Sequence, residues 1–142
     1  MDAPLHPGTV ARLHIPPRAL EGCLYACLWR DLSAASAQGE TLTDAQCQSW
    51  FPATPLCGLS WTLSGRVREL DVGMQDAGDG DGDSEGEGDG DAELWLPASV
   101  IGGPRGGPKR FQATPDCRAF MVAIRPEALR AMTGIDLALL KD

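Results

Sequence analysis

Alternating apolar and polar positions recur along the chain and predict short β-strands. In the clearest case, Leu59, Trp61 and Leu63 alternate with serine and threonine. Because successive side chains of a strand point to opposite faces, this pattern predicts a strand with Trp61 in the core. The serine and threonine hydroxyls of the other face are then expected in solvent. Gly65 marks a turn, and the alternation over residues 66–72 predicts that the next strand pairs back as a hairpin.

Two further runs, residues 24–29 and 117–125, are mostly apolar on both alternating faces. Such runs are expected of strands buried on both sides, although the first is also compatible with a helix. The glycine- and proline-rich segment 102–108 is expected to be a loop, and residues 33–48 are expected to form a connection. Shorter strands are expected at residues 49–51, 94–96, 99–101 and 109–113.

Proline and glycine delimit two predicted helices. Pro17 is placed to begin a short helix that ends at Gly22, since a proline at the first helical position loses no needed N–H group. Pro126 begins a C-terminal helix in the same way, and Gly134 supplies its cap. Residues 1–12 are rich in proline and small or polar residues, and they are expected to form a flexible lead.

Short strands, few helices and proline-rich turns favour a mainly β (α+β) fold. We expect a small antiparallel β-barrel or sandwich, cupin-like or jelly-roll-like, with a short N-terminal helix and a C-terminal helix. The pattern F-x-A-T-P-x-C occurs at residues 51–57 and 111–117, each time just before a predicted core strand. This internal echo is either a duplicated corner of a jelly roll or a chance match.

The acidic residues are concentrated in one tract. The 142 residues suit a single domain, and the formal net charge is −8. Residues 76–93 hold nine of the 20 acids and no base, so the remainder, with 11 acids and 12 bases, has a net charge of +1. A glycine-rich tract of like charges is expected to be a disordered insert between two strands. The nearly neutral remainder argues against direct binding of nucleic acid.

Few residues in the chain are suited to catalysis or metal binding. The only histidines, His6 and His14, precede the first predicted core strand, which argues against a metal site and against a histidine-dependent hydrolase. The cysteines are odd in number and no signal peptide is present, which indicates a cytoplasmic protein with free thiols. No apolar run approaches the roughly 20 residues needed to span a membrane. We therefore expect no catalytic residue, cofactor, metal or membrane association.

Aromatic residues are spread over most of the predicted strands. Together they are suited to line a small apolar cavity with a few indole N–H donors, although in a small barrel the same residues would simply form the core. The candidates for a ligand pocket are Tyr25, Trp29, Trp50, Trp61, Trp95, Phe111 and Phe120.

Several segments share the order and spacing of a known family. The longest, residues 96–136, has the sequence LPASVIGGPRGGPKRFQATPDCRAFMVAIRPEALRAMTGID, and residues 12–31 and 50–61 precede it. These segments resemble successive parts of the N-terminal domain of AraC-type bacterial transcriptional regulators. The resemblance covers residues 13–136 apart from the acidic tract. It implies a cytoplasmic sensor domain that binds a small effector, forms a homodimer, or both, and thereby controls an attached DNA-binding domain.

The chain departs from this family in lacking the helix-turn-helix half that normally follows. The resemblance therefore implies the sensing half alone. Asp136, followed by apolar residues, predicts that residues 137–142 begin a linker helix toward a further domain. Two other functions also fit the sequence: a stand-alone small β-barrel ligand carrier or enzyme with no DNA role, and a protein-interaction module.

Overall fold

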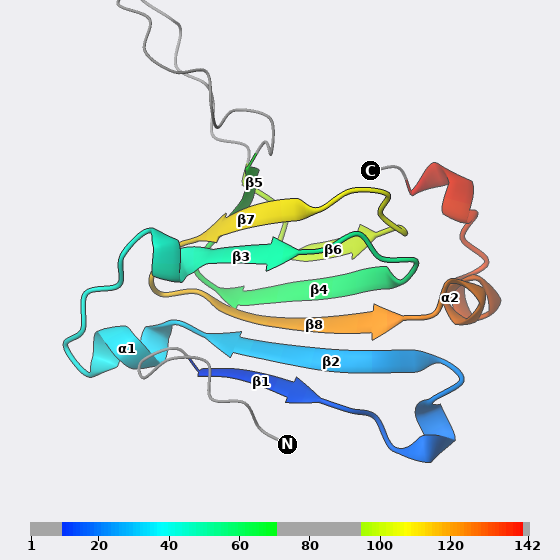
Figure 1. Ribbon diagram of the computed structural model, residues 1–142, viewed down its shortest axis with the longest axis horizontal. Coiled ribbons are helices and arrows are strands. Elements are labelled where there is room, and N and C mark those ends of the chain that lie inside the picture. Colours follow the sequence, from blue (N-terminus) through cyan, green and yellow to red (C-terminus); the bar gives the residue numbers. More distant parts are fainter. Residues whose placement is uncertain (1–9, 71–94, 141–142) are drawn as a thin grey trace, which may run out of the picture.

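The computed structural model describes residues 10–70 and 95–140, which form mainly antiparallel β-structure in two sheets (Figure 1). The larger sheet contains five strands in the order β1 (Val10–His14), β2 (Leu24–Asp31), β8 (Arg118–Ile124), β4 (Cys57–Ser64) and β6 (Ser99–Gly102). The smaller sheet contains three strands in the order β3 (Gln48–Phe51), β7 (Lys109–Ala113) and β5 (Val67–Leu70). The predicted antiparallel, mainly β fold is confirmed.

Successive strands from β2 to β8 alternate between the larger and the smaller sheet. This alternation contradicts one prediction, because β5 does not pair back on β4 as a hairpin. Instead, β5 pairs with β7, with Glu69 opposite Phe111. The chain therefore changes sheet at the turn that follows β4.

Gly65 makes this change of sheet possible. Its φ of 71° lies in the left-handed region, and a Cβ at this position would lie 2.6 Å from Thr114 Oγ1 and 2.7 Å from Cys117 Cα. The next residue is tied to the same segment, since Arg66 N–H donates to Thr114 Oγ1 at 2.9 Å and Thr114 N–H donates to the Arg66 carbonyl at 2.9 Å. The turn is thus packed directly on the segment that leads into β8.

The two copies of the F-x-A-T-P-x-C pattern occupy equivalent corners. Residues 51–57 connect β3 to β4, and residues 111–117 connect β7 to β8, so both lead from the smaller to the larger sheet. In each, the threonine N–H donates to an arginine carbonyl on a facing segment. The phenylalanine rings of the two corners meet edge to face with centroids 5.6 Å apart. The strands on both sides of the corners are neighbours within their sheets.

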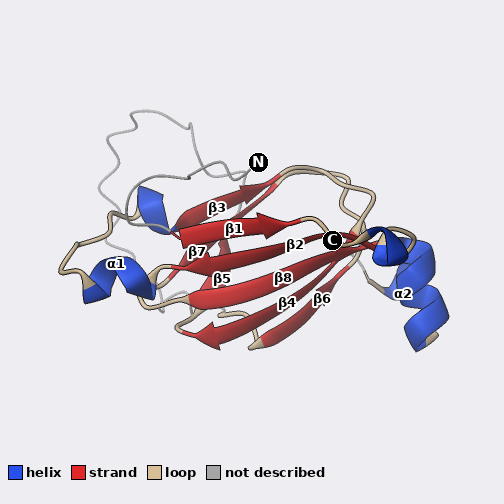
Figure 2. Ribbon diagram, turned by 90° about the horizontal axis from the view of Figure 1, so that it is seen from below, coloured by secondary structure: helices blue, strands red, loops and turns tan. Residues whose placement is uncertain are grey.

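Most of the buried residues that the structure describes fall into two clusters. One contains Leu32, Cys47, Ala113 and Cys117, with Val67 and Ala119 packed against it. The other lies under the helix α2 (Pro126–Thr133) and contains Cys57, Ile124, Ala128 and Leu129. The helix α1 (Ser33–Ala37) and α2 lie at opposite ends of the strands (Figure 1, Figure 2).

The C-terminal helix agrees with its predicted signals. Pro126 occupies the first turn of α2, and Gly134 ends it in the left-handed conformation with φ 70°. The predicted N-terminal helix is a short 3-10 turn, η1 (Arg18–Leu20), that follows Pro17.

Other elements differ from the sequence expectations. The first strand begins at Val10, inside the segment expected to be a flexible lead. The expected connection 33–48 contains α1 and the 3-10 turn η2 (Ala45–Cys47). Alanine favours the helical conformation, and Asp31 Oδ1 accepts from the N–H groups of Ser33 and Ala34 at the start of α1. The expected acidic insert, residues 76–93, lies outside the described residues.

The C-terminal segment forms a short 3-10 turn, η3 (Leu137–Leu139). Asp136 caps this turn as predicted, because its Oδ1 accepts from the Ala138 N–H at 3.0 Å. Leu137 and Leu140 pack against the cluster under α2. The described part of this segment is thus docked on the body of the domain.

The orientation of β4 is the opposite of the predicted one. Ser60 and Thr62 face the space between the sheets, whereas Trp61 and Leu63 are 38% and 57% exposed. The Trp61 ring stacks on that of Phe120, with centroids 5.9 Å apart and planes at 24°. A period of two separates the faces of a strand but does not say which face is enclosed, and here the enclosed face carries the hydroxyls.

Because Trp61 lies on the outer face, its removal should have a modest effect. We expect Trp61→Ala to lower the free energy of unfolding by about 1–2 kcal/mol, below the loss typical of a buried tryptophan, since part of the ring stays in solvent. Urea denaturation measures this change. Trp61→Phe keeps a ring against Phe120 and should lose less. A loss above about 3 kcal/mol for the alanine variant would contradict the outward orientation.

Candidate functional site: a cavity between the sheets

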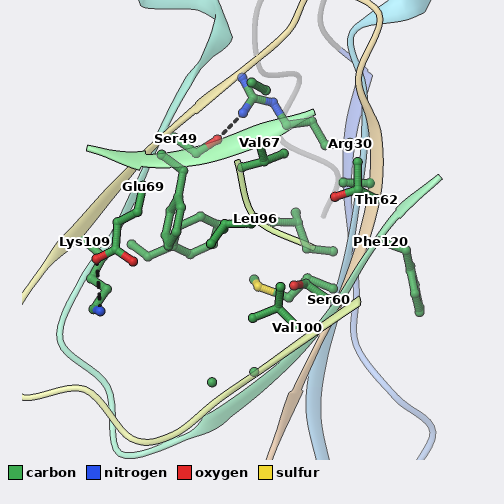
Figure 3. Close-up of a pocket in the computed structure, with 18 of the residues that line it drawn as sticks. Arg30, Ser49, Ser60, Thr62, Val67, Glu69, Leu96, Val100, Lys109 and Phe120 are labelled. Carbon is green, nitrogen blue, oxygen red and sulfur yellow. Dashed lines mark hydrogen bonds and ion pairs between the residues drawn. The ribbon is translucent and has the colours of Figure 1, made fainter. Parts of the chain in front are cut away.

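A cavity of about 290 Å³ lies between the inner faces of the two sheets (Figure 3). It exists because the larger sheet presents small side chains there. Gly58, Ser60 and Thr62 alternate along β4 and border the space, and Gly102 lies opposite Gly58 in β6. Ala119 of β8 lies opposite Thr62. Side chains of this size do not reach across the roughly 10 Å that separates packed sheets.

The smaller sheet supplies an apolar wall to the cavity. Phe51 of β3 and Phe111 of β7 line it, and their edge-to-face contact fixes both rings. Val67 of β5 lies on the same wall, and Leu96 and Val100 complete the apolar lining (Figure 3). Alternation along these strands points these residues inward and their neighbours outward.

Two hydroxyl groups interrupt the apolar lining on the opposite wall. Ser60 and Thr62 belong to β4, and Figure 3 shows both beside the cavity. Over residues 10–70 and 95–140, neither hydroxyl makes a hydrogen bond to another protein group. A hydroxyl both donates and accepts, so the two groups are available to fix the orientation of a bound molecule.

An ion pair also borders the cavity. Lys109 Nζ lies 3.0 Å from Glu69 Oε1, and both side chains belong to the inner face of the smaller sheet (Figure 3). Lys109 is opposite Phe51 in the pairing of β7 with β3, and Glu69 is opposite Phe111 in the pairing of β5 with β7. The charges therefore lie directly beside the aromatic wall.

Arg30 borders the cavity from β2 and ties the two sheets together. Its guanidinium donates to Ser49 Oγ, to the Gln46 carbonyl at 2.8 Å and to the Gln48 carbonyl at 3.2 Å. Burial lowers the pKa of Arg30, while the neighbouring Cys117 and Cys47 act in the opposite direction. Burial likewise raises the pKa of both thiols, and Arg30 partly offsets that rise. This arginine serves the structure of the site.

Three of the predicted pocket residues lie together on the outer face of the larger sheet. Trp29 of β2 is opposite Phe120 of β8, which is opposite Trp61 of β4. Phe120 touches the edge of the cavity, but its ring is stacked on Trp61 and is directed away from the other labelled side chains in Figure 3. Of the seven candidates, Phe111 is the one whose ring contributes to the apolar wall.

The remaining candidates lie elsewhere on the surface. Trp50 and Tyr25 are exposed. The guanidinium carbon of Arg110 lies 5.3 Å from the centroid of the Trp50 ring. The guanidinium carbons of Arg66 and Arg68 lie 4.9 and 5.6 Å from the centroid of the Trp95 ring. These indoles pack against arginine side chains and do not border the cavity.

The search for large aromatic residues therefore missed most of the site. The signal that marks it is the alternation of Gly58, Ser60 and Thr62, which places three small residues on one face of a single strand. This alternation marks a cavity only where that face of β4 is covered, and here the smaller sheet lies across it.

Neither metal-ligand clusters nor long apolar helices occur among the residues that the structure describes. There, no group of three or more histidine, cysteine, aspartate or glutamate residues is arranged to hold a metal ion. None of the helices described is long and apolar enough to cross a membrane. His6 lies outside the described residues, and His14 is the last residue of the edge strand β1.

An apolar space with a few convergent polar groups is the usual form of a small-molecule site. Here the polar groups include the hydroxyls of Ser60 and Thr62 on one wall and the ion pair of Glu69 with Lys109 on the other. Comparisons of the chain with protein-family models, with curated proteins and with solved structures gave no match.

Proposed function

We propose that this chain is a sensor domain that binds a small effector in the cavity between its two sheets and thereby controls an attached DNA-binding domain, as in AraC-type regulators. The observation that carries the proposal is the cavity, with its aromatic wall and with the hydroxyls of Ser60 and Thr62, which make no hydrogen bond to another group of residues 10–70 and 95–140. The resemblance of residues 12–31, 50–61 and 96–136 to the sensor domain of that family supplies the regulatory part.

The size of the cavity limits the affinity that apolar contact alone can provide. Small-molecule sites commonly enclose about 300–1,000 Å³, so about 290 Å³ suits a compact ligand. Burying about 200 Å² of apolar ligand surface contributes about 5 kcal/mol of binding free energy. This value corresponds to a Kd of about 0.2 mM, and the cost of immobilising the ligand weakens binding further. Tighter binding requires hydrogen bonds or charge contacts. The hydroxyls of Ser60 and Thr62 are placed to supply the first of these.

A contact at the rim of the cavity favours a regulatory role. Gly103 borders the cavity, and a Cβ on it would lie 2.4 Å from the Leu140 carbonyl oxygen. The backbone of the C-terminal segment is therefore packed directly against the cavity rim. In the proposed sensor, a ligand that shifts Gly103 also shifts this segment, which leads toward the attached domain.

Filling the cavity tests the proposed binding site. No atom lies within 4 Å of the position that a Cβ would take on Gly58, and its φ is not positive. We expect Gly58→Val to keep or raise the thermal stability and to weaken binding of a cavity ligand by about 100-fold or more, because valine suits a strand and occupies the ligand's space. Ser99→Val places the same side chain on the exposed outer side of the same sheet and should leave binding unchanged.

The measurement is a thermal-shift screen with compact apolar compounds that carry one polar group, followed by calorimetric titration of each stabilising compound. A ligand of the native state raises the melting temperature in proportion to RT ln(1 + [L]/Kd). Compounds that stabilise Gly58→Val as much as the unsubstituted chain would show that the cavity is not the binding site. The regulatory part is tested by the coding sequence after residue 142, where a continuing frame with helix-turn-helix motifs is expected and an immediate stop codon would contradict it.

A further inference from the structure

The charged side chains that border the cavity are mostly basic. Among the residues that the structure describes, they are three bases and one acid, Arg30, Arg105, Lys109 and Glu69, for a net charge of +2. The whole chain, in contrast, has a formal net charge of −8. Low-dielectric walls strengthen the field of such a group, so the cavity favours an anionic ligand although the protein is acidic.

Arg105 is the base whose positive charge is available to pair with a ligand. Its guanidinium carbon lies 5.4 Å from the centroid of the Phe51 ring, and in the described part of the chain no carboxylate pairs with it. Reciprocal backbone hydrogen bonds of 2.8 and 3.0 Å between Arg105 and Thr54 fix the main chain of Arg105. The planar guanidinium presents a fork of N–H donors that matches the two oxygens of a carboxylate.

Lys109 flanks the same aromatic ring. Its Cα is opposite that of Phe51 in the sheet, so Lys109 and Arg105 both lie beside this ring. Glu69 Oε1 lies 3.0 Å from Lys109 Nζ and balances its charge, so within residues 10–70 and 95–140 the charge of Arg105 has no carboxylate partner. The polar end of a ligand is therefore expected beside Phe51.

Arg30 is not available in the same way. Three of its N–H donors are engaged by the Ser49 hydroxyl and by the carbonyls of Gln46 and Gln48. Its fork is thus occupied by the protein's own acceptors. The positive end of the cavity that can receive a ligand is the one formed by Arg105 and Lys109.

We propose that the cavity selects a small apolar monocarboxylic acid, whose carboxylate pairs with Arg105 and whose apolar body lies against Phe51, Phe111 and Val67. This inference rests on the proposed function, because it takes the cavity as the ligand site. It adds that the ligand is an anion and names the residue that recognises its charge. The site then discriminates against neutral molecules of the same shape, which leave the guanidinium without a counter-charge.

Calorimetric titration of the intact chain with matched acids and amides tests the charge preference. The probes are phenylacetate against phenylacetamide and hexanoate against hexanamide, which differ mainly in charge. We expect each acid to bind at least about 10-fold more tightly than its amide. Arg105→Gln should weaken acid binding by about 10- to 100-fold and leave amide binding unchanged, since a hydrogen bond to a charged group contributes about 1.5–3 kcal/mol. Arg105→Lys, which keeps the charge but loses the fork, should be intermediate.

Arg130→Gln is the matched control, because it removes one positive charge from an exposed position on α2. It should leave the binding of acids and amides unchanged. Amides that bind as tightly as acids, or an Arg105→Gln variant that keeps the preference for acids, would overturn the inference while leaving the cavity as a binding site. An equal loss of acids and amides in Arg105→Gln would assign Arg105 a structural role and overturn it too. Failure of all four probes on the unsubstituted chain would count against both the inference and the proposed function.

Discussion

Gly65→Ala is expected to destabilise the domain by about 3 kcal/mol or more, because the variant combines two separate costs. The φ of 71° at this position is unfavourable for a residue with a Cβ. In addition, the new methyl group would lie 2.7 Å from Cys117 Cα and 2.8 Å from Cys117 N, which are backbone atoms and cannot swing away. The change of sheet after β4 must then widen, and β5 is pulled from its place beside β7.

Gly39→Ala separates the two costs. Gly39 has a similar φ of 79°, but no atom lies within 4 Å of the position of its Cβ. This variant should lose only about 1–2 kcal/mol, the cost of the backbone conformation alone. Urea denaturation followed by circular dichroism gives both values. Equal losses in the two variants would mean that Thr114 and Cys117 move aside at little cost.

Leu129→Ala is the second change for which we expect a large loss, about 2–5 kcal/mol. Leu129 is 1% exposed and lies at the contact of α2 with Cys57 and Ile124. Its truncation leaves a cavity under the helix, and two turns of helix cannot remain folded without this contact. Denaturant unfolding measures the loss.

Met132→Ala is the matched control on the same helix, because Met132 is 66% exposed. Its loss should stay within about 0.5 kcal/mol. A large loss for Met132→Ala would show that α2 is covered on its outer side by another part of the protein. Similar small losses for both variants would show that α2 does not stabilise the sheet.

Local signals in the sequence predicted the elements whose formation depends on local chemistry. Pro126 and Gly134 delimit α2 because proline suits the first turn and glycine tolerates the left-handed cap, whatever the helix packs against. The strand β8 was likewise predicted from the apolar run of residues 117–125. The hairpin expected after Gly65 was wrong because strand pairing is decided by contacts far apart in the sequence, here the pairing of β5 with β7.

The cavity was harder to predict because it is defined by what is missing. The face of β4 that carries Trp61 is more apolar than the face that carries the hydroxyls, and this predicts Trp61 in the core. In the structure, Trp61 lies on the outer face and stacks on Phe120. Gly58 borders an enclosed space although it contributes no side chain to it. Hydrophobic patterns in a sequence identify the large side chains that form the walls of a cavity. They do not identify the small residues whose size leaves the space between those walls.

The positions of the tryptophans have a practical consequence for spectroscopy. None of the four indoles, Trp29, Trp50, Trp61 and Trp95, borders the cavity. A compound bound there does not quench intrinsic emission by direct contact. A change in emission on titration would instead report that the strands themselves have shifted, because Trp29 and Trp61 lie on the other face of the sheet that forms one wall. Fluorescence and calorimetry on the same sample would therefore distinguish a ligand that merely occupies the space from one that moves the sheet.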